Sequence, residues 1–382
     1  MEKEHCVIIH YAEIALKGHN RAFFEKALLL NIKKQAEGLY EKIVRISGRL
    51  VLYYAEEKKE EITKALGNVF GIHHFEFGRV TGADMQSMQV KAREMFVKKE
   101  KKSFRVTASR AEKQYPFTSQ EIEREVGRVI HEELGFPVSL DNPEIVLAIE
   151  VVENKAYLLG ERVEGLGGLP VGVSGKVVVL LSNGFDSPVA ALRMMKRGCL
   201  PILLHFHSYP YTSKDALENV YKLRDILSRY SPKQLELIEI PFSGIQQFLA
   251  IKVPSEFRIV MYRRWMLWIA EHIARQKKAH ALVTGDSVGQ VASQTLENIE
   301  TISEIAALPV LRPLAGTDKE EIIDMARAYG THDISKLPYD DCCSLFMEGS
   351  PRTKTTVEEI KKIEEPLRLM LEEKALQAIG GN

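Results

Sequence analysis

The chain has 382 residues, of which 45% are hydrophobic and 27% are charged, a composition that excludes intrinsic disorder and favours two or three globular domains. Basic and acidic residues number 52 each, so the net charge alone does not indicate a nucleic acid or any other polyanionic partner. No apolar run approaches the roughly 20 residues that span a membrane, and four scattered cysteines do not suggest disulfides, so we expect a cytoplasmic protein without membrane contact.

The first 81 residues have the hydrophobic pattern of a small α+β domain. The expected elements, in chain order, are a strand at 6–11, a helix at 20–37 with Asn20 as its N-cap, strands at 43–46 and 50–54, a helix at 56–69 and a strand at 74–80. This strand-helix-strand-strand-helix-strand order is typical of the ferredoxin-like arrangement, which could fold as one unit.

Residues 82–165 predict a second small unit, and part of it is unusually basic. The expected elements are a helix at 85–99, a strand at 103–108, a helix from 118 or 119 to 135, and a hairpin of strands 145–152 and 156–160. Nine basic residues stand against three acidic ones between positions 91 and 113: Lys91, Arg93, Lys98, Lys99, Lys101, Lys102, Arg105, Arg110 and Lys113. This stretch fits a nucleic-acid-binding patch, and it equally fits a solvated helix face followed by a polar turn.

Glycine and proline are concentrated at 163–172, which predicts a linker at 166–174 and a third domain at 175–382. The expected elements of that domain are strands at 177–181, 202–206, 235–240 and 281–284, helices at 188–197, 215–228 and 262–277, and further helices at the end. Apolar strands that alternate with helices predict a parallel sheet covered on both faces.

A polar loop, Ser182-Asn183-Gly184-Phe185-Asp186-Ser187, joins the first strand of the third domain to its first helix. Such a loop directs backbone N–H groups and the positive helix end at one point, which suits a phosphate. Ser182 and Ser187 add hydroxyl donors, and Asp186 would tolerate phosphates only while it holds Mg²⁺. The motifs of Walker-type and dinucleotide sites are missing, and a strand-to-helix turn without a ligand is the alternative.

The loop resembles the S-G-G-x-D-S signature of the PP-loop family, whose enzymes cleave ATP between the α and β phosphates. Segments 11–21, 205–213, 285–295 and 340–344 narrow the resemblance to the tRNA 4-thiouridine synthetases, also called ThiI-type tRNA sulfurtransferases. The later segments follow strand ends, where open α/β sheets bind ligands. Because the chain ends at Asn382, it resembles the short form without a rhodanese domain.

The resemblance implies an α/β protein with an N-terminal ferredoxin-like α+β domain at 1–81 and a THUMP RNA-binding domain at 82–165. At 175–382 it implies a PP-loop domain, a doubly wound parallel sheet of the adenine nucleotide alpha hydrolase type. The implied cofactors are ATP and Mg²⁺, the latter held by Asp186 through Mg-ATP. The residues implied at the nucleotide are Leu180, Leu181, Ser182, Gly184, Ser187, His205, Phe206, Arg263, Gly285 and Gln294. Arg264 could take the place of Arg263, and His205 could instead be a core histidine.

By the same resemblance, Cys343 matches the family's catalytic cysteine, whose persulfide delivers sulfur, and Asp186 is the second catalytic residue. Cys342 could assist or could be a small buried hydrophobe. The implied partners are tRNA, a cysteine desulfurase as persulfide donor, and a second copy of the chain in a homodimer. The candidate RNA-binding residues are Lys101, Lys102, Arg105, Arg110, Lys113 and Phe117. The alternative is that the lysine stems pack against a neighbouring domain.

The chain departs from the family pattern in three respects. Asn183 replaces a glycine, but asparagine also tolerates positive φ, so the loop can still form. Without a rhodanese domain, sulfur must arrive from elsewhere, and the family's secondary role in thiamine biosynthesis is less expected. Without a C-x-x-C pair, an iron–sulfur cluster is not expected.

The sequence thus predicts that O4 of a tRNA uridine, at position 8 by family likeness, attacks the α-phosphate of ATP. Sulfur on Cys343 then displaces AMP and leaves 4-thiouridine. Two alternatives stay open: another PP-loop enzyme, either a tRNA thiolase or an amidating ligase, and an RNA-binding protein that senses nucleotide. A glutaminase domain or a cysteine-rich cluster motif would favour the first alternative, and neither is visible.

Overall fold

The computed structural model describes residues 4–11, 13–46, 48–112, 114–338, 342, 345–346 and 349–380. The chain divides into two compact units, Met1–Leu169 and Pro170–Asn382, each with its own sheet. Within the described ranges, no helix combines the length and the apolar character needed to cross a membrane.

The first unit is built on a seven-stranded sheet. Its strands, in spatial order, are β2 (Lys42–Ile46), β3 (Arg49–Tyr53), β1 (His5–His10), β4 (His74–Gly82), β7 (Lys155–Glu164), β6 (Ile145–Val152) and β5 (Phe104–Arg110). Neighbouring strands are antiparallel except β5 and β6. The pairing of β4 with β7 joins the strands of the two predicted N-terminal domains into this one sheet.

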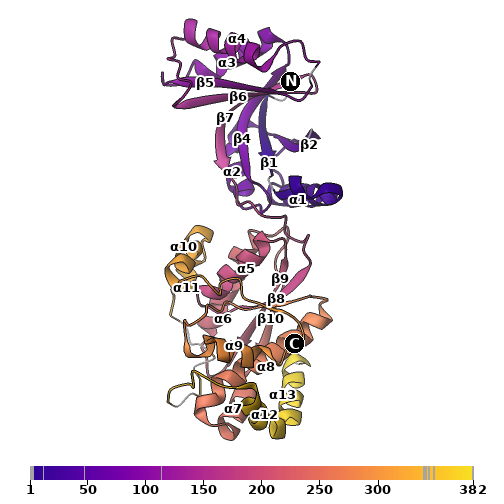
Figure 1. Ribbon diagram of the computed structural model, residues 1–382, viewed down its shortest axis with the longest axis vertical. Helices are drawn as coiled ribbons and strands as arrows, with labels where there is room; N and C mark the ends of the chain where they lie inside the picture. Colours follow the sequence, from indigo (N-terminus) through magenta and orange to yellow (C-terminus); the bar gives the residue numbers. More distant parts are fainter. Residues whose placement is uncertain are drawn as a thin grey trace. The chain divides into compact units, whose positions relative to one another are not determined.

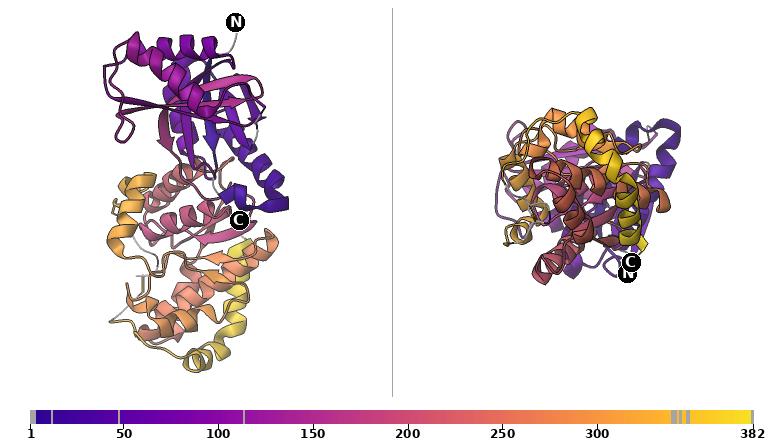
Figure 2. Two further views of the ribbon diagram at one scale, coloured as in Figure 1. Left: turned by 45° about the horizontal axis from the view of Figure 1, so that its top comes forward. Right: turned by 90° about the horizontal axis from the view of Figure 1, so that it is seen from below.

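The helices of the first unit cover one face of the sheet (Figure 2). They are α1 (Arg21–Gln35), α2 (Lys59–Gly67), α3 (Met85–Phe96) and α4 (Ser119–Glu132). Val7 of β1 belongs to the core beneath α1 and α2, and Leu158 of β7 belongs to the core beneath α3 and α4. Val7 pairs with Phe77 of β4, and Leu158 pairs with Arg79 of the same strand. Because Phe77 and Arg79 are two residues apart, they project from the same face of the sheet, and both cores therefore lie on that face. Ile8 and its neighbours form a separate buried cluster on the opposite face.

The second unit is built on a five-stranded parallel sheet. In spatial order its strands are β10 (Leu237–Pro241), β9 (Leu200–His207), β8 (Lys176–Leu180), β11 (Leu282–Val283) and β12 (Val310–Leu311). Its helices are α5 (Asp186–Lys196), α6 (Lys214–Ser228), α7 (Ser243–Lys252), α8 (Ser255–Gln276), α9 (Leu296–Ser303), α10 (Lys319–Tyr329), α11 (His332–Ser335), α12 (Val357–Glu364) and α13 (Arg368–Gly380).

Two layers of helices enclose the parallel sheet (Figure 1). α5 and α6 pack on one face, where α10 and α11 contact them, while α7, α8 and α13 pack on the other face. The main core fills the second layer, where Tyr262 and Trp265 of α8 are almost fully buried together with Leu204 of β9 and Phe242. This confirms the doubly wound parallel sheet that the sequence predicts.

A few elements differ from their predicted bounds. α8 begins at Ser255, seven residues before the predicted start, and neither α7 nor the two-residue strand β12 was predicted. Asn20 does not cap α1 with its side chain. A 3-10 helix, Gly18–Asn20, runs directly into α1, so Asn20 has a helical backbone instead of the extended one that a capping side chain needs.

Candidate functional site

A pocket of about 700 Å³ lies at the carboxyl ends of the parallel strands. β8 pairs with β9 on one side and with β11 on the other, so the strand order changes direction at this point. Open α/β sheets bind ligands at such a position, and the volume suits a small molecule. The ten residues implied at the nucleotide all line this pocket: Leu180, Leu181, Ser182, Gly184, Ser187, His205, Phe206, Arg263, Gly285 and Gln294.

Ser187 closes the loop between β8 and α5. Its hydroxyl oxygen accepts a hydrogen bond from the Ser182 N–H at 2.8 Å and lies 3.0 Å from the Ser182 hydroxyl. α5 begins at Asp186, and its N-cap residue, Phe185, makes no side-chain capping hydrogen bond. The positive end of α5 therefore adjoins the pocket without a side-chain cap, an arrangement that suits an anionic ligand.

Gly285, which follows β11 closely, touches the backbone of the same loop. A Cβ at this position would lie 2.7 Å from the Ser187 nitrogen and 2.8 Å from the Asp186 carbonyl carbon. Both atoms belong to the main chain, so a side chain here would have to displace the loop itself. This close approach explains why glycine occupies the position.

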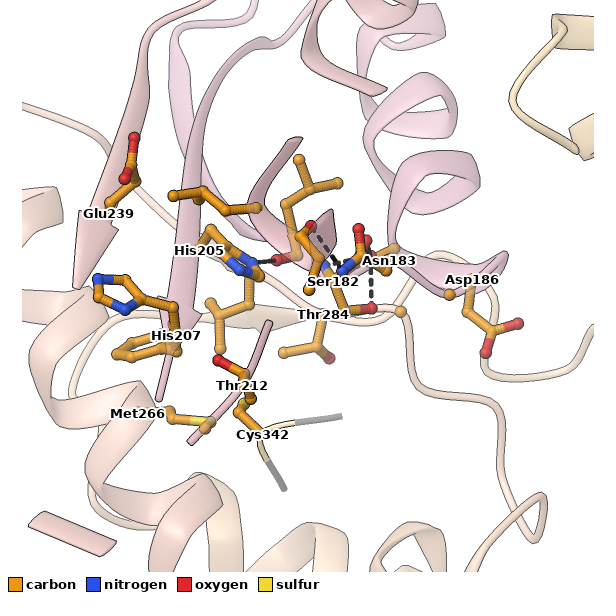
Figure 3. Close-up of a pocket in the computed structure, with 18 of the residues that line it drawn as sticks. Ser182, Asn183, Asp186, His205, His207, Thr212, Glu239, Met266, Thr284 and Cys342 are labelled. Atoms are coloured by element: carbon orange, nitrogen blue, oxygen red, sulfur yellow. Dashed lines mark hydrogen bonds between the residues drawn. The ribbon is translucent and has the colours of Figure 1, made fainter. Parts of the chain in front are cut away.

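Asp186 lies at one end of the pocket (Figure 3). Lys319, the first residue of α10, donates to its carboxylate at 2.7 Å, and Gln290 donates to it at 3.2 Å. Lys319 thus brings a positive charge to the end of the pocket where the loop lies. Lys319 was not predicted from the sequence, since 133 residues separate it from Asp186 and no local pattern connects them.

A buried carboxylate, Asp286, organises the cationic side of the pocket. It is 3% exposed and accepts hydrogen bonds from Arg263, Thr284, Gln294 and Arg312. Burial alone would raise its pKa, but the two guanidinium groups and the Thr284 hydroxyl outweigh that effect and lower the pKa to about 2. Asp286 is therefore ionised at neutral pH and holds Arg263 in place at the pocket wall.

The two adjacent arginines of α8 have different surroundings. Arg263 lines the pocket, whereas Arg264 is 1% exposed and donates to Glu364 at 2.7 Å and to the Thr301 carbonyl. Consecutive helical residues point about 100° apart, which places them on different sides of α8. Arg263 is thus the arginine that can meet a pocket ligand, and Arg264 connects α8 to α9 and α12.

The opposite end of the pocket is formed by β9 and β10 (Figure 3). Nδ1 of His205 lies 2.9 Å from the Leu181 carbonyl, which can only accept, so this nitrogen carries the proton. Burial lowers the pKa of His205 to about 4, so the ring is neutral. Phe206, His207 and Glu239 add an aromatic and polar lining. His205 is therefore a hydrogen-bonded core histidine that also borders the pocket.

Asn183 fits the loop for a different reason from the expected one. Its φ is not among the positive values found at described non-glycine residues, so tolerance of positive φ is not involved. The side chain is 4% exposed, and its amide nitrogen donates to the Ala216 carbonyl at 3.0 Å. Asn183 therefore ties the loop to α6.

Cys342 lines the pocket near Thr212 and Met266 (Figure 3). It is partly exposed, and its carbonyl oxygen accepts a hydrogen bond from the Gln246 amide at 2.5 Å. The position is thus compatible with a role in the pocket and does not match a fully buried hydrophobe. Cys343, the predicted catalytic cysteine, lies outside the described residues.

Comparisons with known proteins match the whole of this organisation. Three family models fit successive segments: the ThiI ferredoxin-like domain at 6–75, the THUMP domain at 82–159 and the thiamine biosynthesis protein ThiI at 172–369. A probable tRNA sulfurtransferase of Thermus thermophilus is 41% identical over 367 residues, 95% of this chain and 89% of the relative. One of Brevibacillus brevis is 39% identical over 365 residues, 94% of this chain and 91% of the relative. The chain belongs to the ThiI family of tRNA sulfurtransferases.

Solved structures agree with this membership of the ThiI family. The crystal structure of a 4-thiouridine synthetase in complex with RNA and bound ATP has a TM-score of 0.89 and 37% identity, and the match covers 98% of each chain. The structure of PH1313 from Pyrococcus horikoshii has a TM-score of 0.68 and 27% identity, and covers 85% of this chain and 99% of that one. These matches confirm the predicted fold class.

In this ThiI family member, the candidate RNA-binding residues lie in the segment that matches the THUMP domain. Lys101, Lys102 and Arg105 are exposed. Arg110 is half-buried and donates to two backbone carbonyls of the following turn at 3.2 Å each, and Phe117 is half-buried against the core beneath α4. The first three side chains thus reach the solvent, while Arg110 and Phe117 shape the turn. Lys113 lies outside the described residues.

Ion pairs offset part of the basic stretch. Lys91 donates to Glu4 at 2.7 Å and to Glu94 at 2.6 Å, and Arg93 pairs with Glu133. The sequence count of basic residues therefore overstates the positive charge that this surface offers to a polyanion.

Proposed function

We propose that this chain is an ATP-dependent tRNA uracil 4-sulfurtransferase, which adenylates a tRNA uridine, at position 8 by family likeness, and converts it to 4-thiouridine. The observation that carries the proposal is the pocket at the start of α5. There an uncapped helix end meets two cations, Arg263 in the wall and Lys319 at Asp186, in a chain of the tRNA sulfurtransferase family. A relative of the same fold is a 4-thiouridine synthetase with bound RNA and ATP, which supports the same assignment.

In this proposal the triphosphate of ATP binds at the α5 end and the adenine at the β9 end. Helix N–H groups and cations, which an anionic triphosphate requires, gather near Asp186 and Arg263. Apolar side chains such as Phe206 and Met266 suit the faces of the base, and the neutral ring of His205 adds no charge there. The two ends of one pocket thus match the two ends of one nucleotide.

Magnesium is implied by the chemistry of ATP, and the residues at the α5 end fit it. Mg²⁺ is bound through one or two carboxylates together with phosphate oxygens, and Asp186 is a carboxylate of the pocket wall. Asp186 would hold the ion, and the ion would neutralise part of the negative charge of the phosphates. Lys319 already pairs with this carboxylate and could then turn to a phosphate oxygen.

The first step of the proposed reaction forms a bond between O4 of the uridine and the α-phosphorus. The bond between the α-phosphorus and the bridging oxygen breaks, and pyrophosphate leaves. Arg263, Lys319 and the N–H groups of α5 stabilise the charge that grows on the departing pyrophosphate.

In the second step, the terminal sulfur of a persulfide on Cys343 attacks C4 of the activated base and AMP leaves. A further thiol then breaks the sulfur–sulfur bond, so that one sulfur remains on the base and the two thiols end as a disulfide. Cys342, which lines the pocket, is a candidate for that thiol.

The reaction requires a sulfur donor and a tRNA as partners. A cysteine desulfurase would load Cys343 with sulfur, and the exposed residues Lys101, Lys102 and Arg105 would contact the tRNA backbone. By likeness to the family, the chain would act in the cytoplasm as a homodimer.

Pyrophosphate release separates this function from its alternatives. With ATP and Mg²⁺, we expect release only when tRNA with uridine at position 8 is present, and a tRNA with cytidine at that position is the matched control. Release in the absence of tRNA would favour a ligase that acts on a small molecule. Nucleotide binding without release, even with tRNA, would favour a nucleotide-sensing RNA-binding protein.

A further inference from the structure

Three side chains that can ligate a metal converge on the helix-free face of the seven-stranded sheet. His10 of β1 lies directly opposite His74 of β4 in the antiparallel register. Glu76, two residues further along β4, projects from the same face. One possible ligand atom from each of the three lies within 4.8 Å of the others, and no second such group of three is found among the described residues.

One nitrogen of this group has no hydrogen-bond partner. Nε2 of His10 is buried and unsatisfied, and the nearest carboxylate oxygen, Oε2 of Glu76, is 3.5 Å away. A buried polar atom without a partner destabilises the folded state, so a ligand that used this nitrogen would stabilise the unit. The rings of His10 and His74 stack with their centroids 4.4 Å apart, which holds both imidazoles at one place.

A third histidine, His73, lies beside this group of ligands. Nδ1 of His73 lies 2.7 Å from Nδ1 of His74, a contact of the kind that orients metal-bound imidazoles through their second nitrogen.

Two guanidinium groups lie beside these ligands, that of Arg162 and that of Arg49, which is close enough to Glu76 to interact with its charge. Arg162 of β7 lies opposite Glu76 in the sheet and would oppose a cation. Its guanidinium, however, donates to Glu164 at 2.8 Å, so a second carboxylate offsets the charge. Glu164 is the register partner of His74, and Arg49 likewise pairs with Glu150, so each guanidinium near the three ligands has a carboxylate partner of its own.

We propose that His10, His74 and Glu76 bind a zinc ion. Two imidazoles and one carboxylate form a ligand set that Zn²⁺ takes in proteins, with the fourth position left to water or to a further group such as His73. The ion would connect β4, the central strand of the seven-stranded sheet, to its neighbour β1. The site would be independent of the nucleotide pocket, whose lining residues all belong to the second unit.

Zinc titration of the full-length, chelator-treated chain tests this proposal. We expect His10→Ala, His74→Gln and Glu76→Gln each to lower the affinity for Zn²⁺ by at least about 100-fold. Loss of an outer-shell partner alone lowers metal affinity by up to about 100-fold, and loss of a direct ligand should lower it at least as much. His19→Ala, which removes an exposed histidine of the same unit, is the matched control and should leave the affinity unchanged. Each variant keeps all four cysteines, so zinc held by thiolates contributes equally to every titration.

Thermal unfolding gives a second measurement, which does not depend on determining the affinity or stoichiometry of zinc binding. Zinc should raise the Tm of the wild-type chain and of His19→Ala, because a ligand that binds only the folded state stabilises it. The rise should be absent in His74→Gln, provided that circular dichroism shows a folded protein without zinc. The proposal fails if wild type and the folded His74→Gln and Glu76→Gln variants bind zinc with the same affinity and stoichiometry.

Discussion

At the scale of single residues, Gly285 lies against the backbone of the loop at 182–187 with no room for a side chain. Gly285→Ala would place a methyl group 2.7 Å from the Ser187 nitrogen, so the loop would have to move. We expect a loss of about 1–3 kcal/mol in the free energy of unfolding, as for other overpacked sites, and an increase of at least about tenfold in the Kd for ATP. Chemical denaturation and calorimetric titration with ATP measure the two effects.

Gly244→Ala provides the control for this prediction. Gly244 lies in α7, and a Cβ there would meet no atom within 4 Å. We expect an unchanged Kd for ATP and a stability equal to or up to about 1 kcal/mol above wild type, because alanine favours helices more than glycine does. If both alanine variants bound ATP like the wild type, the proposed contact between Gly285 and the binding loop would be without functional consequence.

Asp286 makes stability depend on pH in a defined direction. Its pKa is about 2 in the folded chain, below the ordinary value of 3.8, so its ionised form stabilises the fold above about pH 4. This contribution, on the order of 2 kcal/mol, should be lost as the pH falls from about 4 to about 2. Asp286→Asn lacks a group that titrates, so its deficit relative to wild type should shrink over that interval. A deficit that stayed constant in denaturation experiments from pH 4.5 to 2 would contradict this electrostatic role.

The same residues show which parts of the site could be predicted from the sequence. The polar loop and Gly285 were identified at the pocket because they lie in motifs that carry a family resemblance, and the same resemblance implied Arg263, although no motif contains it. The Asp286 network and Lys319 could not be found that way, since their contacts join segments far apart in the chain and depend on the folded geometry. Asn183 was placed correctly in the loop, but its bond to α6 requires knowledge of which helix packs beside it.

At the scale of elements, α8 carries two adjacent arginines with separate tasks. Arg264→Ala should destabilise the second unit by about 3–5 kcal/mol, because it leaves the buried Glu364 without its cation. Arg263→Ala should destabilise it less, since Arg312 still pairs with Asp286, but should raise the Kd for ATP about tenfold or more through loss of a charged donor. Denaturation and ATP titration of both variants check the assignment. If Arg264→Ala weakened ATP binding and Arg263→Ala caused the larger loss of stability, the assignment of Arg263 to the pocket side of α8 would be wrong.

Element order was easier to predict from the sequence than element pairing. The alternation of apolar strands and helices after residue 175 was enough to predict a parallel sheet covered on both faces. By contrast, β12 has only two residues and α7 follows β10 almost directly, so neither gives a periodic signal of its own. The pairing of β4 with β7 joins strands about 80 residues apart, a long-range contact that local patterns do not report.

At the scale of the whole molecule, the two units contribute different chemistry to the proposed reaction. The first carries the segment that matches the THUMP domain, with Lys101, Lys102 and Arg105 exposed, and the second carries the pocket. Substituting all three basic residues by glutamine should weaken tRNA binding, reduce its salt dependence and leave ATP binding unchanged. Equal loss of both activities would argue against this division between the units.

Formation of 4-thiouridine itself tests the account most directly. The chain, ATP, Mg²⁺, unmodified tRNA and a cysteine desulfurase with cysteine are combined, and the tRNA is digested for mass analysis of its nucleosides. The account predicts 4-thiouridine with the wild-type chain and a loss of at least about 100-fold in its yield with Asp186→Ala or Cys343→Ala, as for other residues that act in the reaction itself. A wild-type chain that makes no 4-thiouridine under these conditions, or a Cys343→Ala chain that makes it at the full rate, would contradict the account.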